Sequence, residues 1–123
     1  MKLRIKGNTI RLRLTQTEVD TVAKKEVIDK TQFPGGKELV YKIIKGNSFD
    51  TQFMDGVVLV QLPSEEVDKW AASDQVTIGF KVNLDNGGVL DVAVEKDFQC
   101  LTERPHEDES DMYPNPLEKH AKC

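Results

Sequence analysis

The chain has 123 residues, of which 38% are hydrophobic and 31% are charged, with a formal net charge of −4 at pH 7. This length predicts one domain, residues 1–123, and no apolar run approaches the roughly 18 residues that a membrane-spanning helix needs. The first residues lack the continuous apolar segment of a secretory signal, so we expect a cytoplasmic protein with no membrane partner.

The first half of the chain, residues 1–45, alternates between two kinds of periodicity. The elements expected there are strands over 2–6 and 9–14, a helix over 16–25, and strands over 27–33 and 38–44. The pair Gly7-Asn8 suits a tight turn between the first two strands. Thr15 followed by Glu18 has the spacing of a capping box and predicts the start of the helix.

The second half, residues 46–96, repeats this order. The elements expected there are strands over 48–54 and 57–62, a helix over 65–72, and strands over 75–84 and 89–95. Asp55-Gly56 predicts a hairpin turn, and Ser64 is the predicted cap of the helix. Trp70 lies on the apolar stripe of that helix, so we expect it to be buried.

The repeated order predicts an internal duplication. Glu18-Val19-Asp20 recurs as Glu66-Val67-Asp68, and residues 10–44 and 58–95 are expected to superpose about a pseudo-twofold axis. The alternative is that strands and short helices recur in any α+β chain. The predicted class is α+β, a mostly antiparallel sheet or barrel with two short helices and two pseudo-symmetric halves.

The order strand-strand-helix-strand-strand, with its strand–Pro63–helix step over 57–70, is similar to that of swapped-hairpin barrels such as the AbrB-type transition-state regulators. In those proteins two chains interleave. The resemblance implies that both interleaved units lie within one chain here.

The C-terminal segment, residues 97–123, has no periodicity and contains three prolines. Large apolar residues recur in it at intervals, namely Phe98, Leu101, Met112, Tyr113 and Leu117. We therefore interpret it as a strap anchored to the body rather than a free tail. Its acidic residues are Glu103, Glu107, Asp108, Glu109 and Asp111.

Both ends of the chain resemble an uncharacterised bacterial family of small proteins. The residues that carry the resemblance are Lys2 to Asn8, Arg11 to Leu14, Glu95-Lys96-Asp97-Phe98, Cys100-Leu101, Arg104, Glu107-Asp108-Glu109, Asp111 and Tyr113-Pro114-Asn115-Pro116. The likeness covers most of the chain and implies no particular activity.

A basic hairpin is the leading candidate site. Residues 1–14 contain five bases and no acid, whereas residues 15–96 and 97–123 carry net charges of −5 and −4. Alternation places the five bases on one face, as an anion- or partner-binding surface formed by Lys2, Arg4, Lys6, Arg11 and Arg13. The alternatives are a solvated face or pairing with the protein's own acids. We further expect the strap, 103–111, to lie near this face and mask it.

Metal sites are less well supported by the sequence. A zinc site could use Cys100, His106, His120 and Cys123, but their spacing is looser than that of structural zinc sites. The alternative is that Cys100 is buried and the histidines are exposed. The acidic run from Glu107 lacks the ordered spacing of a calcium loop. We expect no cofactor and no metal site.

These observations favour a non-catalytic cytoplasmic binding or interaction module, with regulation as one role. One alternative is a phosphate-handling enzyme that uses the basic hairpin with Glu95. Another is a nucleic-acid-binding protein, although the pI of about 5.2 and the scarcity of aromatic residues argue against it. The partner is expected to be an anionic ligand, a protein or a nucleic acid.

Overall fold

The computed structural model describes residues 1–98 and 110–114, which form two short helices and two four-stranded sheets. In chain order the elements are β1 (Lys2–Lys6), β2 (Thr9–Leu14), α1 (Gln16–Lys24), β3 (Glu26–Phe33), β4 (Lys37–Gly46), β5 (Asp50–Met54), β6 (Val57–Pro63), α2 (Ser64–Ala71), β7 (Thr77–Asn83) and β8 (Val89–Lys96). The predicted α+β class is confirmed. Of the predicted alternatives, sheet or barrel, the described strands form two sheets.

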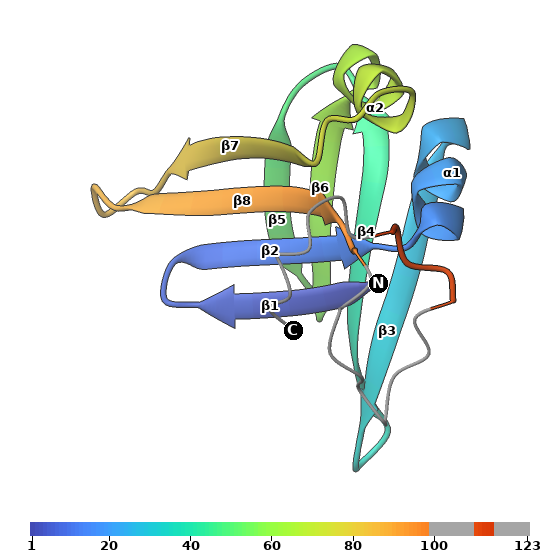
Figure 1. Ribbon diagram of the computed structural model, residues 1–123. Helices are drawn as coiled ribbons and strands as arrows, with labels where there is room; N and C mark the ends of the chain where they lie inside the picture. The colour runs from blue at the N-terminus through green and yellow to red at the C-terminus, as the bar shows by residue number, and fades with distance from the viewer. Residues whose placement is uncertain (99–109, 115–123) are drawn as a thin grey trace.

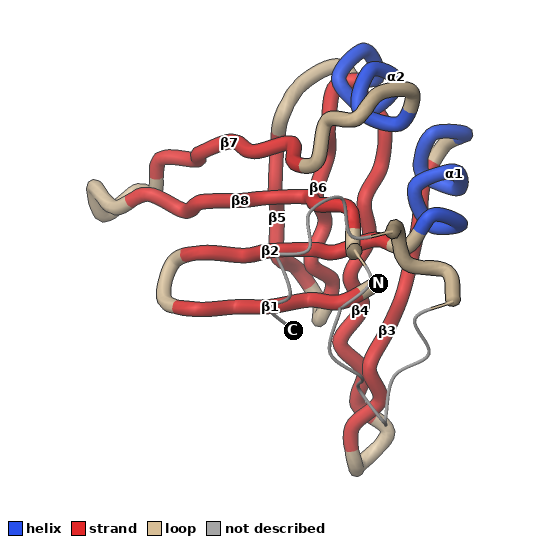
Figure 2. The backbone as a smooth tube through the Cα atoms, viewed as in Figure 1, coloured by secondary structure: helices blue, strands red, loops and turns tan. Residues whose placement is uncertain are grey.

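Each sheet has a parallel pair at its centre. The first sheet has the order β1-β2-β8-β7 and the second has the order β3-β4-β6-β5. The central pairs β2–β8 and β4–β6 are parallel, and the four outer pairings are antiparallel hairpins. Figure 1 shows the strands of the first sheet crossing those of the second, with α1 and α2 side by side at one end of the second sheet. Figure 2 separates the helices and strands in the same view.

The strand register confirms that the two halves are equivalent. The pair Leu3–Leu12 of the first hairpin corresponds to Thr51–Val60 of β5–β6, a shift of 48 residues. Seven of the eight pairs of β3–β4 recur in β7–β8 with a shift of 51 residues, and the two parallel pairings correspond under the same shifts. Each half therefore contributes one hairpin to each sheet, so neither sheet belongs to one half alone.

The hydrophobic core lies between the sheets and beneath the helices. It combines Leu12, Leu14, Val92 and Val94 of the first sheet with Ile43, Val60 and Leu62 of the second, together with Val19, Val22, Val67 and Trp70 of the helices. Trp70 is 0% exposed, as predicted, and its Nε1 donates to the Val76 carbonyl at 2.8 Å. Because alternate residues of a strand face opposite sides, the other residues of each strand form an outer face.

The helix caps agree with the sequence in one case only. Thr15 and Glu18 form the predicted capping box of α1. The predicted cap of α2 is wrong: Pro63 is the N-cap residue, and Ser64 is already the first helical residue. The Ser64 hydroxyl donates to the Gly46 carbonyl at 3.3 Å instead, because the parallel pairing of β4 with β6 brings that carbonyl close.

The described residues of the strap are 97, 98 and 110–114. Phe98 and Tyr113 form a β-bridge, and their ring centroids lie 5.6 Å apart. The Tyr113 amide donates to the Asp97 carbonyl at 2.8 Å, and Met112 is buried. Asp97, Phe98 and Tyr113 all belong to the strap, so these contacts join two parts of it. Contacts with the body include the Gln16 amide, which donates to the Asp111 carbonyl at 2.9 Å, and Tyr113, which packs against the core. The predicted anchoring is therefore confirmed for residues 110–114, whereas Leu101 and Leu117 lie outside the described residues.

Candidate functional site: the cationic face of the first sheet

The structure places the five bases of the hairpin on one face, as the alternation predicts. Cα pairing sets Lys2 opposite Arg13 and Arg4 opposite Arg11, while Lys6 faces Thr9. Their neighbours along the same strands, such as Leu12 and Leu14, point into the core. We call this outer surface, formed by Lys2, Arg4, Lys6, Arg11 and Arg13, the cationic face.

The cationic face contains two unfavourable cross-strand pairs. Like charges directly opposite each other on neighbouring strands are destabilising. Arg11 and Arg13 are partly compensated, because Glu95 of β8 accepts from the Arg11 Nη1 at 3.2 Å and from the Arg13 Nε at 3.4 Å. The Thr77 hydroxyl donates to the same carboxylate at 3.4 Å. Glu95 therefore fixes the two guanidinium groups in position beside the hollow between β1 and β2.

That hollow has a volume of about 300 Å³ and is lined by Arg4, Lys6, Thr9, Arg11 and Arg13. Within residues 1–98 and 110–114, neither Arg4 nor Lys6 has a carboxylate partner. An arginine has five N–H donors, so Arg11 and Arg13 retain donors beyond the one that each gives to Glu95. The hollow thus offers donors and positive charge to an anion.

The second half of the chain provides an internal comparison for these residues. The positions equivalent to Arg4, Lys6, Thr9, Arg11 and Arg13 are Gln52, Met54, Val57, Leu59 and Gln61, in the same register. Glu95 is replaced by Ile44. The equivalent hairpin therefore has the same strand register with an uncharged surface at these positions.

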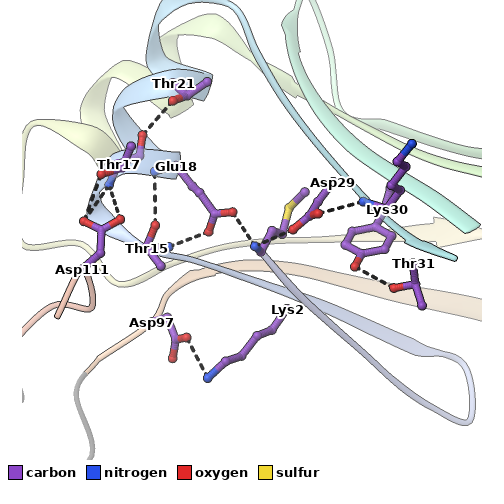
Figure 3. A network of polar contacts seen from close by, with 12 residues as sticks. Lys2, Thr15, Thr17, Glu18, Thr21, Asp29, Lys30, Thr31, Asp97 and Asp111 are labelled. Atoms are coloured by element: carbon purple, nitrogen blue, oxygen red, sulfur yellow. Dashed lines mark hydrogen bonds and ion pairs between the residues drawn. The ribbon is translucent and has the colours of Figure 1, made fainter. Parts of the chain in front are cut away.

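The acidic strap is only partly described. Asp111 lies at the N-terminus of α1, where its carboxylate accepts from the Thr17 hydroxyl at 3.0 Å and from the Thr17 amide at 3.4 Å (Figure 3). This interaction satisfies a helix N-terminal N–H, and the negative charge suits the helix dipole. Glu103, Glu107, Asp108 and Glu109 lie outside the described residues, so masking of the cationic face stays a prediction.

Among the described residues of the strap, Asp97 contacts the basic hairpin. It is buried, and its carboxylate lies 3.0 Å from the Lys2 Nζ (Figure 3). Nearby, the Met1 ammonium pairs with both Glu18 and Asp29. Burial opposes its charge, but the two carboxylates outweigh burial and raise the pKa of the Met1 ammonium above its ordinary value. These groups already compensate one another at the N-terminal end of β1.

Lys96 is a buried base that the sequence did not single out. Its Nζ donates to the Ser73 carbonyl at 2.6 Å and lies 5.8 Å from the Trp70 ring and 5.4 Å from the Tyr113 ring. Burial lowers its pKa from the ordinary value, which nearby Asp74 partly opposes. Its equivalent Lys45 donates to the Ala23 carbonyl at 2.9 Å. Both lysines thus bind carbonyls at helix C-terminal ends, which is a structural role.

Metal ligands do not gather in the part of the chain that the structure describes, where no group of three His, Cys, Asp or Glu is placed to hold an ion. Cys100, His106, His120 and Cys123, the weak zinc candidates, lie outside it. No helix among the described residues has the length and apolar character to cross a membrane.

Sequence reasoning missed the surroundings of the cationic face. Thr77, Gly79 and Ala93 lie on the same outer face, because β7 and β8 pair beside β2. Glu95 was considered only as a catalytic group, not as the partner of two arginines. A local signal for this pairing is lacking, since β2 and β8 are far apart in the sequence and pair in parallel.

Together these features define a small α+β protein of two equivalent halves, with one cationic and one uncharged outer sheet surface at the compared positions. The chain belongs to a family of unknown function: the model described as Family of unknown function (DUF7009) matches residues 1–117. The predicted membership of an uncharacterised family is thus confirmed. Searches among curated proteins and among solved structures found no match. The similarity to AbrB-type barrels stays a prediction.

Proposed function

We propose that the protein is a non-catalytic module that binds phosphate-bearing anions on the cationic face. The observation that carries this proposal is the contrast between the two halves: the hairpin β1–β2 has clustered cations where β5–β6 has Gln52, Met54, Leu59 and Gln61. Like charges gathered at positions that are uncharged in the equivalent hairpin support a role in binding an anion. The cytoplasmic location stays a prediction.

The test is binding of inorganic tripolyphosphate, measured by calorimetry at low ionic strength. The variant Arg4→Gln/Arg13→Gln introduces the residues found at Gln52 and Gln61, so the fold position tolerates them. We expect its affinity to fall at least about tenfold, which corresponds to about 1.4 kcal/mol. The matched control is Lys42→Gln, which removes one cation from the outer face of the second sheet and should bind as the wild type does. Absence of tripolyphosphate binding by the wild type contradicts the proposal.

The enzyme alternative depends on Glu95, which would act on a phosphate compound bound by the hairpin. Both carboxylate oxygens of Glu95 already accept hydrogen bonds from Arg11, Arg13 and Thr77. This arrangement fits a role for Glu95 in positioning the arginines better than it fits a role as a free general base. Metal-dependent turnover that is lost in Glu95→Ala and Arg11→Ala would favour the enzyme, whereas binding without turnover supports the module.

A further inference from the structure

The shape of the cationic face narrows the class of ligand. Lys2, Arg4 and Lys6 form one rank along β1, and Arg11 and Arg13, with Thr9, form a second along β2. Residues two apart in a strand are about 6.8 Å apart, so each rank has a regular spacing close to that of successive phosphates in an extended nucleic-acid backbone. From Thr9 to Arg13 the row is about 14 Å long, enough for about three phosphates.

The ranks are close enough to contact one backbone from both sides. Neighbouring strands lie about 4.8 Å apart, which is narrower than the DNA minor groove of about 6 Å or the major groove of about 12 Å. A strand of a duplex completes a turn in about 10 base pairs, so its phosphates soon leave a straight row. A flexible single strand can follow the row along its whole length.

The surface beside the ranks has few large side chains. Asp91 and Lys81 continue the row of Thr9, and Glu95 and Thr77 continue the row of Arg13. Next to Arg11 the row continues through Ala93 and Gly79, and a Cβ added to Gly79 would meet only the Val92 carbonyl, at 3.8 Å. Among the described residues, no aromatic side chain occupies an outward position of the first sheet, so stacking of bases is not supplied. Affinity would therefore come mainly from phosphate contacts.

We propose that the cationic face binds the phosphate backbone of a single-stranded nucleic acid, which lies extended along β1 and β2, with no preference among the bases. This inference rests on the proposed function and specifies its ligand. The net charge of −4 repels a polyanion elsewhere on the protein, so binding is confined to this face and strongly reduced by salt.

Fluorescence anisotropy of a labelled oligothymidylate of about ten nucleotides tests the inference between about 50 and 200 mM salt. With three or four phosphates contacted, the slope of log K against log salt should be about −2 to −3. Arg4→Gln/Arg13→Gln should make the slope shallower by about 1.4, because each lost single-strand contact removes about 0.7. Lys42→Gln should leave it unchanged. An oligoadenylate of the same length should bind within about threefold of the oligothymidylate.

Three results would overturn the inference. One is a duplex of equal length that binds as tightly as the single strand. Another is a dinucleotide that binds as tightly as the longer oligomer, which points to a compact anion. The third is an equal loss of affinity in Lys42→Gln. If the wild type binds tripolyphosphate but not the oligothymidylate, this inference is rejected and the proposed function stands. If it binds neither, both the inference and the proposed function are rejected.

Discussion

Replacing Arg4 by glutamine should make the fold more stable while weakening anion binding. Arg4 lies directly opposite Arg11 and has no carboxylate partner in residues 1–98 and 110–114. At about 5.5 Å, the general spacing of Cβ atoms directly opposite each other on neighbouring strands, two unit charges repel by roughly 0.8 kcal/mol in water and by roughly 3 kcal/mol at an effective dielectric constant of 20. Both side chains are exposed and Glu95 compensates Arg11, so the lower figure applies. We expect Arg4→Gln to raise the free energy of unfolding by about 0.3–1 kcal/mol at low ionic strength.

Urea unfolding followed by the fluorescence of Trp70, the single tryptophan, measures this change. The gain should disappear near 1 M salt, where the Debye length is about 3 Å. Lys42→Gln is the control, because Lys42 lies opposite Ile28 and Leu59 and loses no repulsion on substitution. A loss of stability in Arg4→Gln, or a gain that is the same at high and low salt, would refute the reasoning about repulsion.

Three further predictions concern the strap and the buried lysine. Asp111→Ala should lower the free energy of unfolding by about 1 kcal/mol, because Thr17 loses its acceptor at the start of α1; a double-mutant cycle with Thr17→Ala should show coupling, and additive effects would contradict the contact. Lys96→Met should cost about 1–2 kcal/mol at pH 7 through the lost bond to Ser73 and the lost ring contacts. Burial holds the pKa of Lys96 in the folded protein below 10.5, so between the folded and unfolded pKa values the unfolded chain binds more protons. The stability of the wild type relative to Lys96→Met should therefore rise with pH through that window. A stability difference that falls with pH would contradict burial of the ammonium. Neutralising the strap acids should tighten tripolyphosphate binding, and unchanged affinity would argue against masking; the substitutions are Glu103→Gln, Glu107→Gln, Asp108→Asn and Glu109→Gln.

Local elements were predictable wherever one periodicity dominated over several residues. The alternation of Ile10, Leu12 and Leu14 fixed both the strand and the side on which Arg11 and Arg13 lie. The Thr15–Glu18 spacing identified the start of α1, since a capping box involves only residues within one turn. Ser64 was misassigned because the serine that follows Pro63 looks like a cap, whereas the chain enters helical geometry one residue earlier.

The sequence alone determined the types of element, their order, the repeat and the cationic side of the first hairpin, because each depends on neighbouring residues. Only the tertiary structure decided that each sheet takes one hairpin from each half, and that β8 lies in parallel beside β2. That choice depends on how two amphipathic hairpins and two helices bury their apolar faces together, which local periodicity does not encode. It brings Glu95 to Arg11 and Arg13 across more than eighty positions of sequence. Thus the charges were visible in the sequence, but the arrangement that turns them into a candidate site was not.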